Sequence, residues 1–245
     1  MGAMKQLAET AGQVPPEEPK AAPLTFPKVM QKLFDDSRTQ IMATLPERID
    51  ADRFIMVALT AITRNTALID CSPASVFLAV MESARIGLFP DGREAAIIPY
   101  KGIATLQPMV QGIIRLMLRS PGLLKVESRA VYDGDDFEFQ YGLHPDLRHV
   151  PREKSDQLTH AYAVLWRQGT EPTFEVVTRD EIEQARLTSR APDSPAWKWY
   201  GEMARKVAVK RLGKYADLSP EASRAIELDN LVSGSPWGDK EPEGV

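Results

Sequence analysis

Apolar residues recur three and four positions apart along the first part of the chain, which is the spacing of one helix face. This pattern predicts a helix within residues 27–45. A second helix is expected after Asp50, because aspartate is a favoured N-cap residue. A third is expected to open at Ser72-Pro73 and to end at Gly87, since proline suits the first helical turn and glycine suits the residue after the last.

The middle of the chain changes to short runs rich in β-branched and aromatic residues. Strands are expected at 94–100, 103–110, 123–133, 136–141, 158–166 and 172–177. The pair Asp133-Gly134 stands between two of these runs and suits a type I′ turn, which indicates a hairpin there. Helical patterns return at 178–188, 197–215 and 219–230. Helices around one block of hairpin-linked strands predict the α+β class.

Both ends of the chain are expected to be tails outside the folded domain. Residues 1–26 are rich in proline and poor in large apolar side chains, so they bury too little surface to offset the entropy of ordering. Residues 231–245 form a short acidic tail that contains Asp239, Glu241 and Glu243. The folded domain is therefore expected to span 27–230.

Composition narrows the class of protein. The chain has 245 residues, of which 43% are hydrophobic, and a single cysteine, so an intrachain disulfide is excluded. We find no apolar run of the roughly 18 residues that a membrane span requires, and no signal-peptide pattern. These features favour a cytoplasmic protein. The net charge of −4 gives no global sign of nucleic-acid binding.

The expected helix at 197–215 is locally basic. It carries one acid, Glu202, against Lys198, Arg205, Lys206, Lys210, Arg211 and Lys214. Lys206, Lys210 and Lys214 are four positions apart, so they are expected to form one exposed stripe about 6 Å per step. A solvated helix face is the simpler interpretation. However, like charges at this spacing repel each other, and a bound polyanion would relieve that repulsion.

A second basic cluster lies within residues 93–129, at Arg93, Lys101, Arg115, Arg119, Lys125 and Arg129. Gln107 and Gln111 add neutral donors that suit phosphate or sugar oxygens. Two basic blocks in an acidic chain make a groove for a polyanion plausible.

Other chemistries find less support in the residues. The chain has neither a GxxxxGK[ST] phosphate loop nor a GxGxxG turn, and its three histidines lack the HExxH spacing of a zinc site. A metal-dependent nuclease would use carboxylates such as Asp133, Asp135, Asp136 and Glu138. These flank the expected hairpin turn, where aspartate has a local backbone role.

Several blocks of the chain, in order and spacing, resemble the RecT family of phage single-strand annealing proteins, which are related to the lambdoid phage beta protein. They are LIDCSPAS at 68–75, GLFPDG at 87–92, AIIPYK at 96–101, RAVYDGDDF at 129–137 and the basic block at 202–215. The resemblance covers about residues 30–230. It implies a small antiparallel sheet with a helix across it, flanked by N- and C-terminal helices.

The resemblance also implies a function. Similar proteins bind single-stranded DNA without ATP, assemble into rings or helical filaments and anneal complementary strands in homologous recombination. The implied partners are single-stranded and annealed duplex DNA, other copies of the chain, a phage-encoded 5′–3′ exonuclease and the host single-strand-binding protein. No cofactor and no membrane is implied.

Carried over by position, the candidate DNA-binding residues are Lys101, Gln107, Gln111, Arg115, Lys198, Arg205, Lys206, Lys210, Arg211 and Lys214. Trp197, Trp199 and Tyr100 are candidates for stacking on bases, with core packing as the simpler role for a tryptophan. Gln111 departs from the family, which often has a basic residue there, so it ranks below the lysines. Two alternatives stay open: a nuclease that uses the Asp133–Glu138 carboxylates, and a structural oligomer that does not bind DNA.

Overall fold

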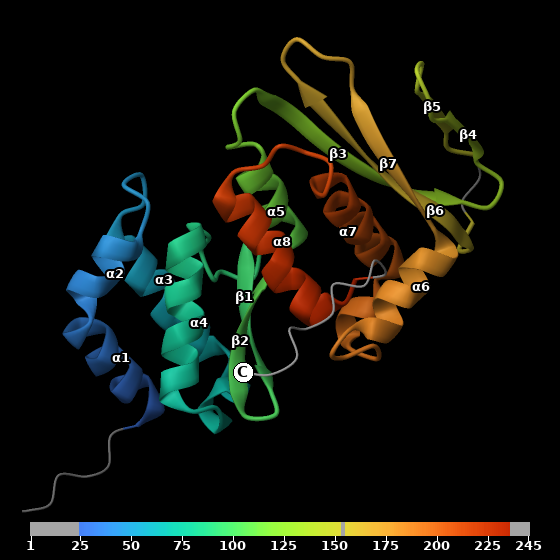
Figure 1. Cartoon of the computed structure of the whole chain (residues 1–245). Coiled ribbons are helices and arrows are strands. Elements are labelled where there is room, and N and C mark those ends of the chain that lie inside the picture. Colours follow the sequence, from blue (N-terminus) through green and yellow to red (C-terminus); the bar gives the residue numbers. More distant parts are fainter. Residues whose placement is uncertain (1–24, 153–154, 236–245) are drawn as a thin grey trace, which may run out of the picture.

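The computed structural model describes residues 25–152 and 155–235. Figure 1 shows the chain passing from a group of helices, through a central hairpin, to a sheet backed by helices. Most of the two expected tails, residues 1–24 and 236–245, lies outside the described residues.

The N-terminal part is helical, as its apolar spacing predicts. It contains α1 (Phe26–Asp36), α2 (Arg38–Thr44), α3 (Ala51–Arg64), the 3-10 helix η1 (Thr66–Asp70) and α4 (Pro73–Ile86). The expected start and stop signals are confirmed. The Asp50 carboxylate accepts from the Arg53 N–H at 2.8 Å, and Gly87 closes α4 with a φ of 67°. The stretch expected as one helix within 27–45 forms two, because the chain leaves helical geometry at Ser37.

The strands form three antiparallel sheets among the described residues, where one block was expected. They are β1 (Ala95–Tyr100) with β2 (Ile103–Pro108), β3 (Leu123–Tyr132) with β6 (Leu158–Arg167) and β7 (Thr173–Thr178), and β4 (Asp136–Gln140) with β5 (Asp146–Val150). In the three-stranded sheet β6 is central. Helices and small antiparallel sheets together confirm the α+β class.

The prediction of a hairpin across Asp133-Gly134 is wrong. β3 pairs with β6 and β4 pairs with β5, so the turn joins two different sheets. Of its two central residues only Gly134 has a positive φ, whereas a type I′ turn needs both. The Asp135 carboxylate explains the change of direction, because it accepts from the N–H groups of Tyr132 and Arg152, each at 2.9 Å.

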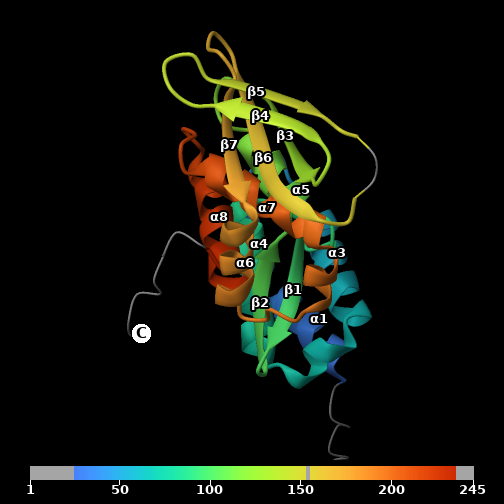
Figure 2. The same cartoon turned by 90° about the vertical axis from the view of Figure 1, so that its right-hand side faces the viewer.

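Helix α7 (Tyr200–Gly213) crosses one face of the three-stranded sheet and contacts β3, β6 and β7. Figure 2 shows the β4–β5 hairpin on the opposite face. That hairpin packs through Phe137 and Leu147 against Tyr162 and Phe174. The helix across the sheet that the family resemblance implies is therefore present.

Four more helices complete the described part of the chain. They are α5 (Val110–Met117), α6 (Arg179–Thr188), the 3-10 helix η2 (Pro195–Lys198) and α8 (Pro220–Ser233). α5 replaces the end of the strand expected at 103–110. α8 continues three residues past the expected boundary at 230, and its Val232 and Ser233 are buried. Of the helices in the described ranges, none has the length and apolar content to cross a membrane.

Candidate nucleic-acid interface

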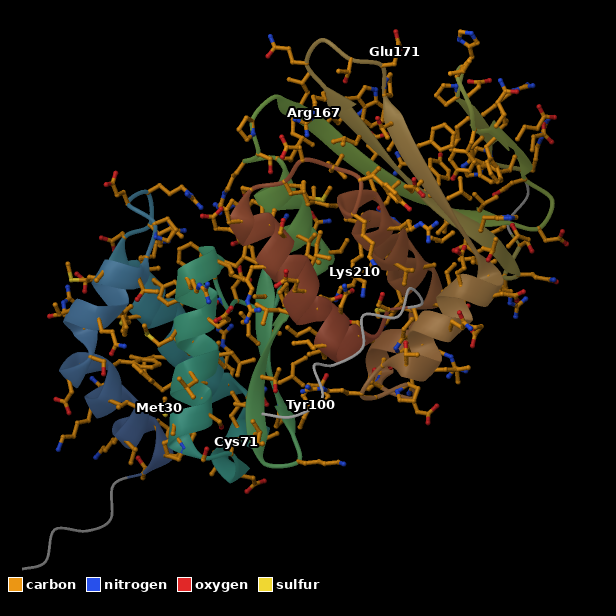
Figure 3. All side chains as sticks on the ribbon, viewed as in Figure 1. Met30, Cys71, Tyr100, Arg167, Glu171 and Lys210 are labelled. Carbon is orange, nitrogen blue, oxygen red and sulfur yellow. The ribbon has the colours of Figure 1, made fainter. Side chains whose placement is uncertain are left out.

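Lys206 and Lys210 are buried, so the expected exposed stripe on α7 does not form. Their exposed fractions are 5% and 1%, and Figure 3 shows Lys210 in the interior, on α7. Both ammonium groups face Asp229 on α8, whose exposed fraction is 0%. Lys206 Nζ lies 2.5 Å from Asp229 Oδ1, and Lys210 Nζ lies 3.1 Å from Oδ2.

The two lysines also bind backbone carbonyls. Lys206 Nζ donates to the Pro108 oxygen at the end of β2, at 3.1 Å, and Lys210 Nζ donates to the Gly234 oxygen at 2.8 Å. Burial alone would raise the pKa of Asp229, but the two lysines and the hydrogen bonds outweigh it and hold that pKa below its usual range. This network, which we call the Asp229 cluster, ties α7, α8 and β2 together. Replacing either lysine therefore tests folding before it tests DNA contact.

The arginines of α7 are held in ion pairs at the helix surface. Arg205 pairs with Glu202 at 2.8 Å, and its Nε lies 3.4 Å from Ser128 Oγ on β3. Arg211, with 23% of its side chain exposed, pairs with Glu175 on β7 at 3.2 Å. These carboxylates offset much of the positive charge that the sequence alone places on α7.

Lys101 is at the tip of the β1–β2 hairpin and is exposed. It is the sole non-glycine residue with positive φ in the described ranges (50°), and Gly102 follows at 81°, so the two form a type I′ turn. The backbone of this tip is fixed, since the Ser72 N–H donates to the Gly102 oxygen at 3.4 Å. A lysine in left-handed geometry is costly, and such strain is most often retained where a side chain has a function.

We expect Lys101→Asn to leave the fold intact and to raise the free energy of unfolding by up to about 1 kcal/mol, because asparagine tolerates left-handed geometry better than lysine. Urea denaturation of the wild type and the variant measures this. A clear loss of stability would show that the lysine side chain supports the hairpin, contrary to its proposed role in binding.

Two further expected lysines are exposed. Lys198 ends η2, and Lys214 follows the last turn of α7. Trp199, next to Lys198, is 73% exposed, whereas Trp197 is buried and lies 6.2 Å from the ring of Tyr200. Core packing is thus confirmed for Trp197. An exposed tryptophan beside a lysine offers both a stacking surface and a charge for a single strand.

The candidates on β2 and α5 are separated by the fold. Gln107 is half-buried and donates to Ser233 Oγ at 3.0 Å, which joins it to the Asp229 cluster. Gln111 is exposed in the first turn of α5, and Arg115, on the same helix, pairs with Glu94 while half of its side chain stays exposed.

Among the carboxylates near Asp133, Asp135 is the one that binds the backbone of the turn. Asp135 is buried against His149, whose Nε2 lies 3.0 Å from Asp135 Oδ2. Burial would raise the pKa of Asp135, but hydrogen bonds from two backbone N–H groups and from His149 lower it overall. Asp136 pairs with Arg152. Within residues 25–152 and 155–235, acids, histidines and cysteine nowhere gather in threes as metal ligands would.

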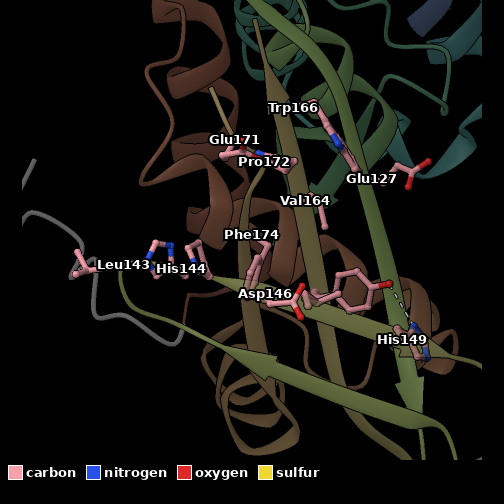
Figure 4. A pocket seen from close by; sticks show the side chains of 13 residues that line it. Glu127, Leu143, His144, Asp146, His149, Val164, Trp166, Glu171, Pro172 and Phe174 are labelled. Carbon is pink, nitrogen blue, oxygen red and sulfur yellow. Dashed lines mark hydrogen bonds between the residues drawn. The ribbon is translucent and has the colours of Figure 1, made fainter. Parts of the chain in front are cut away.

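A groove of about 720 Å³ lies between the β4–β5 hairpin and the three-stranded sheet (Figure 4). Its lining includes the aromatic rings of Tyr162, Trp166 and Phe174. It also includes three acids, Glu127, Asp146 and Glu171, which would repel phosphates. None of the candidate DNA-binding residues lines this groove, so it is not the expected interface.

Comparison with known proteins decides the family. A model of the RecT family matches residues 52–242. The chain belongs to the RecT family. Protein RecT of Escherichia coli (strain K12) is 34% identical over 204 residues, which cover 78% of this chain and 76% of that protein. The RecT match begins at the start of α3 and includes the sheets, α7 and α8. Membership in the RecT family makes the chain a DNA recombination and annealing protein.

Proposed function

We propose that the protein binds single-stranded DNA and anneals complementary strands without ATP, using the exposed members of its candidate set. These are Lys101, Gln111, Arg115, Lys198 and Lys214. The observation that carries the proposal is the exposed, strained lysine at the tip of the β1–β2 hairpin, in a chain of the RecT family. Lys206 and Lys210 have a structural role in this proposal.

The physics of annealing requires no fuel. Two DNA backbones repel each other, and a cationic surface that neutralises one of them lowers this barrier. Stacking of the new duplex, about 1.4 kcal/mol per base step, then drives pairing. Because the bases must stay free to pair, the protein is expected to hold the backbone, so affinity depends on salt more than on sequence.

The proposal extends to assembly and partners. A ring or helical filament of many copies would hold a long strand extended, which a single copy of this size does not do. A phage-encoded 5′–3′ exonuclease would supply the single strand, and the host single-strand-binding protein would bind the same DNA. Neither a cofactor nor nucleotide hydrolysis is part of the proposed mechanism.

Two measurements test this function. Fluorescence anisotropy measures the binding of a labelled oligonucleotide over a range of salt concentrations. A gel then shows whether the DNA stays intact in the presence of magnesium. We expect affinity that falls steeply with salt and DNA that stays intact. Magnesium-dependent cleavage would favour the nuclease alternative. Oligomers that form fully without DNA, together with no salt-sensitive binding, would favour the structural alternative.

The double variant Asp133→Asn, Asp136→Asn is expected to anneal at the wild-type rate. The Asp133 side chain is exposed, and Asp136 makes one exposed ion pair with Arg152, so their charges serve the turn region alone. Stopped-flow measurement of strand pairing compares the two proteins. A folded variant that has lost annealing would overturn this assignment of the carboxylates.

A further inference from the structure

Two arginines, Arg48 and Arg119, lie beside Gly87, and a third, Arg115, is close to Arg119. Gly87 ends α4, and a methyl group built on it would lie 3.1 Å from Arg48 Nη2, in the connection between α2 and α3. Arg119 Nη1 donates to the Gly87 oxygen at 3.3 Å. Arg115 is four residues before Arg119 and is close enough for its charge to act on the Arg119 guanidinium. In Figure 1 the end of α4 lies between the α2–α3 connection and α5.

The charge of this cluster is poorly balanced. Arg115 pairs with Glu94, but neither Arg48 nor Arg119 forms an ion pair with a carboxylate in residues 25–152 and 155–235. Burial first, and then the charges of Arg48 and Arg115, lower the pKa of Arg119 to about 10, although Glu221 opposes the shift. The cluster therefore destabilises its own positive charge.

The C-terminal end of α4 explains the position of only one of the three arginines, Arg119. A cation gains from the partial negative charge at a helix C-terminus, and Arg119 uses it through the Gly87 oxygen. Arg48 is exposed, and about half of the Arg115 side chain is exposed as well. Both side chains are therefore accessible to an anion with several oxygens.

We infer that Arg48, Arg115 and Arg119 form a binding site for a phosphate group, and, resting on the proposed function, that a phosphodiester of the DNA backbone occupies it. The guanidinium fork matches the oxygens of a phosphate, and two or three forks around one phosphate satisfy it from several sides. The site is open at the surface, as a continuous backbone requires. It extends the candidate interface from Arg115 to two residues outside the expected set.

Arg48→Gln and Arg119→Gln, compared with Arg179→Gln as a control at an exposed position of α6, test the site. Binding of labelled oligothymidylate is measured over a range of salt concentrations. Each of the first two variants is expected to weaken binding at low salt and to reduce the salt slope by up to about 0.7, the share of one phosphate contact with a single strand. The control is expected to keep the wild-type slope.

The second arm of the test measures stabilisation of the protein by inorganic phosphate. At matched ionic strength, it should raise the melting temperature of the wild type and of Arg179→Gln more than that of Arg48→Gln. A phosphate response with unchanged DNA slopes assigns the site to free phosphate. If the variants keep the wild-type salt slope and the wild-type response to phosphate, the site is overturned. This holds even if the variants differ from the wild type in self-association.

The two arms separate this inference from the proposed function. If the wild type fails to bind the oligonucleotide at any salt concentration, the proposed function fails while the phosphate arm still decides the arginine site. If the wild type binds DNA and the variants match it in both arms, the site alone fails. Arg48 is exposed, so its variant remains informative even if loss of the Arg119 hydrogen bond to Gly87 disturbs folding.

Discussion

Asp229→Asn is expected to lower the free energy of unfolding by about 3–5 kcal/mol, because it leaves two buried ammonium groups without a counter-charge. Lys206 and Lys210 are almost fully buried, at exposed fractions of 5% and 1%, so hydration relieves little of this loss. Urea denaturation measures the change. Glu227→Gln, on the exposed side of the same helix, is the matched control and should stay within about 0.5 kcal/mol.

The same variant predicts a pH dependence. The folded-state pKa of Asp229 lies below its unfolded value, so its stabilisation is present above the unfolded pKa and is lost as pH falls through the folded pKa. The difference in unfolding free energy between the wild type and Asp229→Asn should therefore be full near neutrality and should shrink below about pH 4. A difference that stays constant down to pH 2 would contradict a charged Asp229.

An apolar replacement of the whole cluster separates charge from shape. Lys206→Met, Lys210→Met and Asp229→Leu together remove all three charges of the cluster, so this triple variant should recover most of the stability lost in Asp229→Asn. A triple variant as unstable as the single one would show that packing or the hydrogen bonds to Pro108 and Gly234, rather than an unpaired charge, dominate.

The second large effect concerns DNA. The variant Lys101→Asn, Lys198→Gln, Lys214→Gln is expected to bind single-stranded DNA about tenfold or more weakly at low salt, with a salt slope smaller by about 2 if each lysine contacts one phosphate. All three positions are exposed, so the circular dichroism spectrum should match that of the wild type, and the stability should not fall below it. Anisotropy titrations at several salt concentrations measure both quantities.

The control for that variant is a second triple variant, which loses the same amount of positive charge at positions outside the proposed interface. Lys28→Gln, Lys32→Gln and Arg179→Gln remove three positive charges from exposed positions on α1 and α6. If the control weakens binding as much as the first triple variant, net charge rather than a defined surface governs affinity. Equal affinity of the wild type and the first triple variant would remove these lysines from the interface.

Much of the fold follows from local sequence signals. Asp50, Ser72-Pro73 and Gly87 mark helix ends as their capping chemistry predicts, and most strands coincide with their β-rich runs. The sequence pattern does not predict α5, because Pro108 precedes the helix and Gly112 lies within it. The buried Ile113, Leu116 and Met117, three and four positions apart, carry the signal that would have found it. β5 has two apolar residues, Leu147 and Val150, which do not alternate with polar ones, so its sequence does not mark a strand.

The burial of Lys206 and Lys210 depends on a long-range contact. A basic row on one helix looks solvent-exposed until its partner is known, and Asp229 is 23 residues from Lys206. A signal was nevertheless present in α8. Asp229 falls on the apolar face that Ala222, Ala225, Ile226 and Val232 define, and an acid there indicates a buried partner of opposite charge. The arginines at Gly87 come from segments far apart in sequence, so spacing alone does not join them.

Strand pairing without nucleotide is the most direct test of the proposed function. One labelled oligonucleotide is mixed with the protein, its complement is added in buffer without ATP and with EDTA, and duplex formation is followed at two salt concentrations. We expect pairing faster than that of free strands, with an acceleration that falls at high salt. Intact DNA and folded protein with no acceleration at either salt concentration would contradict annealing by backbone binding.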